Sequence, residues 1–177
     1  MFSRNEKVVY PGYGVALINR IVEKKIAGNI VFFFELKFFS REMIILIPVD
    51  NAATVGIRKL SSTDCINDIF KALALPVEQC APHDMSMSNW NKRNKDYQLK
   101  LRRGNLSEIG EIYRDIKHIG LQKELSFGEK VLLQQTEALL VEEISLIKNM
   151  ATDETLEFLR SLIPSGRSAT IELARTM

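Results

Sequence analysis

The spacing of apolar residues changes near residue 61, and this change constrains the fold more than any other feature of the chain. Before it, short runs rich in β-branched and aromatic residues are separated by turn signals, as is typical of β-strands. After it, apolar residues recur three and four positions apart, as on one face of an α-helix. No helical pattern separates the strands, so parallel βα units are not expected. We therefore predict an α+β chain in two modules, a small β barrel followed by a compact all-α domain.

The first 60 residues predict five short strands joined by tight turns, an arrangement typical of a small Tudor-like or SH3-like barrel. The segment 11–14 (PGYG) predicts a turn, because proline fixes φ and glycine permits positive φ. A second turn is expected over Lys24–Asn29, and Pro48 is expected to end the fourth strand. The strands are predicted at Lys7–Tyr10, Val15–Val22, Ile30–Phe39, Met43–Ile47 and near Val55–Arg58.

Capping signals mark the predicted ends of the helices in residues 61–163. Ser126 with Glu129 forms a capping-box sequence, and Asn105 with Glu108 resembles one. The helices are predicted from Ser62 or Thr63 to about Leu73, from about Asn89 to Arg103 before Gly104, from Asn105 to about His118 with Gly120 ending it, from Ser126 to about Asn149, and from Thr152 or Asp153 to about Leu162. Residues 164–177 are expected to form a flexible tail. The short join near residues 57–62 predicts that the two modules pack on each other.

The sequence offers no strong catalytic or cofactor-binding pattern. It has no glycine-rich phosphate loop and no nucleophile elbow. Cys65, Cys80, His83 and His118 are too few and too isolated for a disulfide scaffold or a four-ligand metal site. No stretch approaches the ~18 consecutive apolar residues of a membrane span, and the N-terminus is too polar for a signal peptide. We therefore expect a cytoplasmic, non-enzymatic protein with no cofactor, no metal and no membrane contact.

The window from residue 88 to 95 (SNWNKRNK) combines the one tryptophan of the chain with three basic residues. Lysine and arginine bind phosphates and release counterions, and a large ring can wedge into a widened minor groove. This pattern favours DNA binding around Trp90. The alternative is that Trp90 anchors a helix in the core and that the basic residues only solvate that helix.

Strand alternation raises a second question about partners. In the aromatic strand, Phe33 and Phe39 fall on the face opposite the one that can fill the barrel, where Phe32, Phe34, Leu36 and Phe38 lie. The run Met43–Ile47 is apolar at every position, which is too apolar for a strand with one face in water. Either the helical module covers these residues, or the run is an edge strand that pairs with another protein.

Four sequence elements, taken together, resemble the CarD/CdnL family of bacterial transcription regulators over about residues 1–150. They are VVYPGYGVA at 8–16, IPVDNA at 47–52 with VGIR at 55–58, NWNKR at 89–93 and LSFGEK at 125–130. The resemblance implies a Tudor-like domain in residues 1–60 that binds the β subunit of RNA polymerase. It also implies a helical domain in residues 61–163 that lies on promoter DNA at the upstream fork of the bubble, reads little sequence and stabilises the open complex.

The resemblance further implies roles for individual residues. It gives DNA contact to Trp90, the wedge, and to Lys92, Arg93, Lys95 and Lys130. It gives polymerase contact to Lys24, Leu36, Leu46 and Pro48. Because some family members carry arginine where this chain has Leu46, the polymerase contact here is expected to be more apolar. Asn94 likewise stands where some members have an aromatic residue.

The formal net charge of +2 argues against tight binding to free DNA. Tethering through the barrel would supply a high effective concentration instead. We therefore expect a monomer that binds promoter DNA usefully only on the polymerase. Two other hypotheses remain open from the sequence, a protein-only adaptor and an RNA-binding Tudor-like module.

Overall fold

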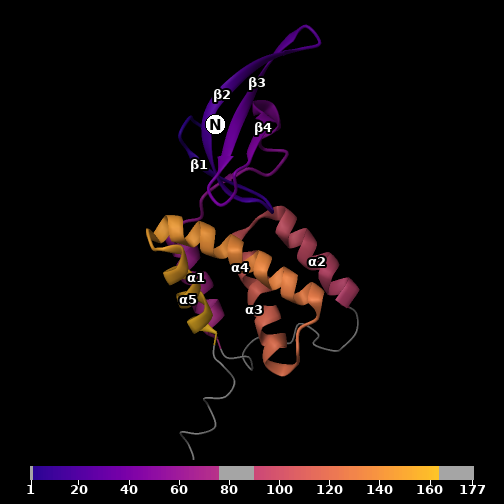
Figure 1. The fold of residues 1–177 in the computed structure, drawn as a ribbon, viewed down its shortest axis with the longest axis vertical. Coiled ribbons are helices and arrows are strands. Elements are labelled where there is room, and N and C mark those ends of the chain that lie inside the picture. Colours follow the sequence, from indigo (N-terminus) through magenta and orange to yellow (C-terminus); the bar gives the residue numbers. More distant parts are fainter. Residues whose placement is uncertain (1, 76–89, 164–177) are drawn as a thin grey trace, which may run out of the picture.

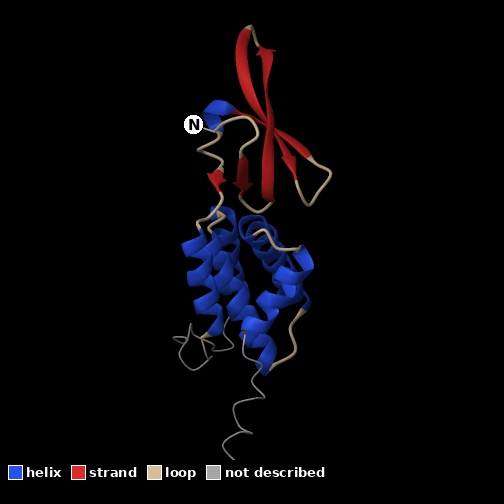
Figure 2. Cartoon of the chain, turned by 90° about the vertical axis from the view of Figure 1, so that its left-hand side faces the viewer, coloured by secondary structure: helices blue, strands red, loops and turns tan. Residues whose placement is uncertain are grey.

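The structure is a computed structural model that describes residues 2–75 and 90–163. A β module lies at one end of the molecule and a helical module at the other (Figures 1 and 2). The predicted two-module α+β class is therefore confirmed. Cys80, His83 and the predicted tail at 164–177 lie outside the described residues.

The β module is one antiparallel sheet of five strands in the order β4-β3-β2-β1-β5. Its elements are β1 (Lys7–Tyr10), β2 (Gly14–Ile26), β3 (Asn29–Phe38), β4 (Ile44–Pro48), a 3₁₀ turn η1 (Val49–Asn51) and β5 (Arg58–Lys59). Each edge strand, β4 and β5, pairs with one neighbour among the described residues. Pro48 ends β4 as predicted.

The β2–β3 hairpin is longer than the sequence predicted. Its turn consists of Ala27 and Gly28 alone, both with positive φ (47° and 87°), as two-residue hairpin turns require. The hairpin therefore extends beyond the rest of the sheet (Figure 1). This length explains why Phe32 is 51% exposed although its strand face leads into the core. Phe34, Leu36 and Phe38, lower on the same face, are buried as predicted.

The helical module consists of α1 (Thr63–Ala74), α2 (Trp90–Arg103), α3 (Leu106–Gln122), α4 (Phe127–Lys148) and α5 (Thr152–Leu162). Ser62, Asn105 and Ser126 cap α1, α3 and α4 with their side chains, as the sequence predicted. Two predicted helix ends were wrong. Helix α3 continues through Gly120 to Gln122, and Ala151, which has no capping side chain, precedes α5.

Each module has its own core. Apolar side chains from all five helices form the larger core, with Tyr97, Ile112, Tyr113, Leu140 and Ile144 among its buried members. The barrel core is smaller and is built around Val8, Ile18, Phe34 and Leu36. Helix α4, the longest, lies directly beneath the β module (Figure 1) and contacts β2. It therefore joins the two modules structurally.

Candidate functional site

The first turn of α4 is fixed by a reciprocal capping box. The Glu129 carboxylate accepts hydrogen bonds from the backbone N–H and the hydroxyl of Ser126, each at 2.8 Å. The Glu129 N–H in turn donates to the Ser126 hydroxyl at 3.4 Å. This arrangement satisfies amide groups that a helix start would otherwise leave unpaired. The sequence element LSFGEK therefore starts a well-defined helix.

Glu129 also forms ion pairs with two basic side chains, although it is only 2% exposed. Its Oε1 lies 3.4 Å from Arg93 Nη2 and 3.5 Å from Lys123 Nζ. Burial opposes ionisation of the carboxyl, but the hydrogen bonds from Ser126 and the charge of Lys123 outweigh burial, so the pKa of Glu129 is lowered. Because the Arg93 side chain is turned toward Glu129 and is only 20% exposed, Arg93 ties α2 to α4.

Trp90, the first residue of α2, lies on the backbone of α4. A Cβ atom added to Gly128 would come within 2.9 Å of Trp90 Cζ2, so the glycine makes room for the indole ring. Trp90 is half-buried and packs against the helical core. The structure thus brings together two sequence elements, NWNKR and LSFGEK. It leaves Trp90 neither fully buried nor free in solvent.

Lysine side chains surround this contact on the exposed side. Lys92 and Lys95 are exposed and make no hydrogen bond or ion pair within the described residues. Lys130 is 53% exposed and pairs at 3.0 Å with Glu124, which is 87% exposed. Such an exposed pair contributes only about 0–1 kcal/mol, so Lys130 can readily exchange it for another anion. Four of the five residues predicted to contact DNA therefore offer at least part of their surface to a ligand, and Arg93 is turned inward.

Phe127 was missed by the sequence analysis. It is 84% exposed, more than any other large apolar residue described, and it directly precedes the glycine on which Trp90 lies. The sequence gives no signal for its exposure, because the residues that share its helix face, Val131 and Ala138, are apolar too; the structure shows that this face is exposed while Leu132 and Leu139 are buried. We define the aromatic–lysine surface as Trp90, Lys92, Lys95, Phe127 and Lys130.

In the β module, three of the four predicted polymerase contacts share the outer face of the sheet. Phe33 lies opposite Pro48, and Lys24 Nζ lies 5.9 Å from the centre of the Phe33 ring, a cation–π distance. Leu46 lies opposite Glu35 on the same face. We define the edge surface as Lys24, Phe33, Leu46 and Pro48, of which Phe33 was not assigned from the sequence.

Leu36, the fourth predicted contact, is fully buried in the barrel core. It belongs to β3, which pairs on both sides with β2 and β4, so its backbone cannot pair with a partner strand either. Leu36 therefore packs in the core and is not accessible for a contact with the polymerase. The alternation of strand faces could have excluded it, because Leu36 shares a face with Phe34 and Phe38.

Glu35 would place a negative charge on the edge surface, but it is neutralised locally. It accepts hydrogen bonds from Arg20 Nε at 2.9 Å and Asn19 Nδ2 at 2.7 Å. These bonds lower the pKa of Glu35 and keep the charge paired. Lys24 makes no ion pair with any described residue, so it remains free to bind an acidic partner.

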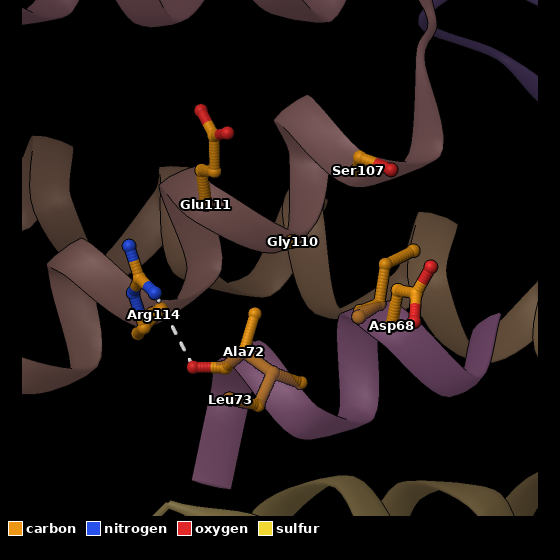
Figure 3. A pocket seen from close by; sticks show the side chains of 8 residues that line it. Asp68, Ala72, Leu73, Ser107, Gly110, Glu111 and Arg114 are labelled. Carbon is orange, nitrogen blue, oxygen red and sulfur yellow. Dashed lines mark hydrogen bonds between the residues drawn. The ribbon is translucent and has the colours of Figure 1, made fainter. Parts of the chain in front are cut away.

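A separate pocket of about 170 Å³ lies between α1 and α3. Asp68, Ser107, Glu111 and Arg114 line its rim, and Arg114 donates to the Ala72 carbonyl at the end of α1 (Figure 3). None of the predicted site residues lines it. In residues 2–75 and 90–163, no three His, Cys, Asp or Glu side chains are grouped so as to hold a metal ion. No described helix is long and apolar enough to cross a membrane.

Comparisons with known proteins match both modules in order. The family model for the CarD-like/TRCF RID domain matches residues 2–61, and that for the CarD C-terminal domain matches residues 79–160. "Putative transcription factor YdeB" of Bacillus subtilis (strain 168) is 23% identical over 158 residues, which cover 89% of this chain and 99% of that protein.

Among solved structures, the chain is similar to the solution NMR structure of the 72-residue N-terminal domain of Myxococcus xanthus CarD. The identity is 26%, the match covers 35% of this chain and 83% of that one, and the TM-score is 0.30. The assignment rests on the two family models, which together span most of the chain. This protein belongs to the CarD/CdnL family of transcription regulators.

Proposed function

We propose that this protein binds the β subunit of RNA polymerase through its edge surface and promoter DNA through its aromatic–lysine surface, and thereby stabilises the open promoter complex. The observation that carries the proposal is the pairing of these two surfaces on separate modules of one chain of this family. One surface is largely apolar and borders the unpaired outer edge of β4. The other presents aromatic rings among lysines.

The polymerase contact is supported by the free edge of β4. An edge strand exposes unpaired N–H and C=O groups that an extended segment of another protein can satisfy. Leu46 and Pro48 of β4 are half-buried, and Ile44 is 60% exposed, so a partner strand would also cover apolar surface. Lys24 adds a charge that selects an acidic neighbour.

The DNA contact is supported by the position of Trp90 and Phe127 at the start of two helices. Lys92, Lys95 and Lys130 supply phosphate contacts, which hold a protein on DNA without reading sequence. An aromatic side chain that inserts at an already opened fork binds the melted state better than the duplex, and this difference shifts the equilibrium toward melting. Arg93 acts indirectly in this proposal, by holding α2 against Glu129.

The central experiment measures the lifetime of the open complex on one promoter, with the polymerase of the same organism. We expect wild-type protein to lengthen the lifetime, Trp90→Ala to lose most of this effect, and Phe127→Ala to lose part of it. Phe158→Ala, which removes a partly exposed ring from α5, is the matched control and should behave as wild type. If wild-type protein binds polymerase but leaves the lifetime unchanged, the proposal fails.

A second experiment tests the edge surface directly. Leu46→Asp places a negative charge in an apolar contact, opposite Glu35 on the neighbouring strand, so binding to a polymerase β fragment should weaken at least tenfold. The control is Leu99→Asp, which introduces the same change on the exposed face of α2. Equal affinity of the two variants would show that the contact lies elsewhere.

Salt dependence separates DNA binding from a purely protein-based role. Removing one lysine–phosphate interaction should reduce the slope of log K against log[salt] by about 0.9 in magnitude. We therefore expect Lys92→Ala and Lys95→Ala each to reduce the slope for forked DNA, and Lys37→Ala on the β module to leave it unchanged.

The contact of Trp90 with Gly128 also fits a protein-only adaptor, and absence of any forked-DNA binding on the polymerase would favour that role. Stronger binding to single-stranded RNA than to forked DNA would favour the RNA-binding alternative.

A further inference from the structure

Two sequence elements that neither surface uses lie where the two modules meet. They are the turn PGYG at 11–14 and the segment VGIR at 55–58. Figures 1 and 2 show that this end of the β module rests on the helical module. The contacts made by these elements indicate what they do.

Arg58 forms a bidentate ion pair that joins the two modules. Its Nη1 and Nη2 atoms donate to Oε1 and Oε2 of Glu143 on α4, at 2.8 and 2.7 Å. The Ser61 N–H donates to the same carboxylate at 2.8 Å, and Arg58 Nε donates to the Gly104 carbonyl at 2.7 Å. The Glu143 side chain is only 3% exposed and that of Arg58 25%. A bidentate pair of this kind fixes orientation as well as distance.

The turn at 11–14 makes two close approaches to the helical module. A Cβ atom on Gly104, which has φ +67°, would lie 3.0 Å from the ring of Pro11. A Cβ atom on Gly14, with φ +104°, would collide with the Glu142 carboxylate. Both glycines therefore allow their own backbone to lie against a side chain of the other module, where any other residue would hold the modules apart.

Helix α4 links these contacts to the aromatic–lysine surface. Glu142 and Glu143 lie near its C-terminal end, and Gly128, which carries the Trp90 ring, lies in its first turn. Fifteen residues of helix between positions 128 and 143 span about 22 Å. A helix packed into the core along this length moves as a unit. The orientation of the β module on α4 thus sets the direction in which Trp90 and Phe127 face.

We propose that Arg58, Glu143, Pro11 and Gly14 form an inter-module clamp, and that the fixed geometry held by this clamp is required for stabilising the open complex. The clamp residues are positioning residues, because they touch neither proposed partner surface. This inference rests on the function proposed above. With the clamp closed, binding of the β module to the polymerase holds Trp90 at one position relative to the DNA, at high effective concentration. With the clamp open, the β module still binds the polymerase, but the Trp90 ring samples many positions.

The test uses the full-length chain and three variants. Glu143→Gln removes the charge, Arg58→Lys keeps a charge but not the paired bonds, and Arg58→Ala removes the contact. Glu157→Gln, at an exposed position on α5, is the matched control for the amide change. Circular dichroism and thermal unfolding identify variants that no longer fold. Arg58→Lys is the mildest change and keeps the test decisive if the others unfold.

The first readout is the geometry of the free protein. Spin labels are placed at Lys37→Cys and Gln134→Cys, exposed positions on different modules, with Cys65 and Cys80 changed to serine. Electron–electron double resonance should give one narrow distance distribution with the native clamp and with Glu157→Gln, and a broadened one for Arg58→Ala, Glu143→Gln and Arg58→Lys. A broad distribution with the native clamp, or a narrow one in the clamp variants, would overturn the clamp.

The second readout is the lifetime of the open complex. We expect the increase in open-complex lifetime caused by each clamp variant to be at least fivefold smaller than the increase caused by wild type. The affinities of the variants for the polymerase β fragment and for forked DNA should stay within twofold of wild type. Full lengthening in a variant whose distance distribution has broadened would overturn the functional half of the inference. If wild-type protein itself does not lengthen the lifetime, the proposed function and its dependence on the clamp both fail, and the distance measurement alone decides whether the clamp exists.

Discussion

Replacement of Glu129 by glutamine tests whether one buried carboxylate holds the aromatic–lysine surface together. The change keeps the shape of the side chain and removes its charge. Two hydrogen bonds from Ser126 at 2.8 Å become neutral ones, and the difference between charged and neutral bonds is about 1 kcal/mol each. Arg93 loses its carboxylate partner in a largely buried position, which adds about 1–2 kcal/mol. We therefore expect Glu129→Gln to lower the free energy of unfolding by about 3–4 kcal/mol at pH 7.

Urea unfolding followed by circular dichroism measures this change, because the signal reports the helical module. The sign of its pH dependence follows from the lowered pKa of Glu129. A carboxyl whose pKa is lower in the folded state stabilises the fold above its unfolded pKa of about 4.3, and this stabilisation disappears as the pH falls through the folded value. The difference between wild type and variant should therefore shrink on acidification below pH 4.

The control is Glu124→Gln, a nearby change at an exposed carboxylate that pairs with Lys130. It should alter the free energy of unfolding by no more than about 0.5 kcal/mol. A Glu129→Gln effect of the same small size would refute the reasoning. So would an effect that is unchanged between pH 7 and pH 3.

Three further changes test individual contacts. In Gly128→Ala the new methyl group displaces the Trp90 ring, so tryptophan emission should shift to the red and become more accessible to iodide; unchanged emission would mean that the ring does not rest on this glycine. Gly14→Ala should destabilise the protein by more than about 1 kcal/mol in thermal unfolding, and by more than Gly12→Ala, which also has positive φ but nothing within 4 Å; equal destabilisation would show that the close approach at Gly14 does not matter. Burial raises the pKa of Glu142, so its contribution to stability should fall as the pH rises above about 4.3. The stability difference between wild type and Glu142→Gln should therefore change with pH when unfolding is measured from about pH 4 to 8; parallel curves would contradict it.

Local signals in the sequence were enough to predict most of the elements. The Ser126 capping box involves residues three apart, and the turn at Gly28 needs a residue that tolerates positive φ, so both can be recognised from the chain alone. Gly120 misled the prediction because α3 packs on Leu125, and a Cβ atom at this glycine would make an ordinary contact with Leu125. Tertiary packing there outweighs the low helix propensity of glycine.

The candidate surfaces were predicted less completely, because they depend on contacts between distant residues. Nothing near Trp90 in the sequence indicates that its ring rests on Gly128, and nothing near Arg93 indicates that its charge faces Glu129. Arg58 and Glu143 are 85 residues apart. Leu36 was different, since strand alternation contained enough information to exclude it.

The 22 residues of α4 also limit how this chain can vary in length. Inserting one residue between Gly128 and Glu143 would lengthen the helix by about 1.5 Å and turn one end by about 100° relative to the other. Such an insertion would misdirect the Trp90 ring even if every side chain contact were otherwise preserved. Substitutions at exposed positions such as Gln134 and Ala138 carry no such penalty. Among related chains, α4 should therefore tolerate changes of residue far better than insertions or deletions, whereas the tip of the β2–β3 hairpin should tolerate changes in length.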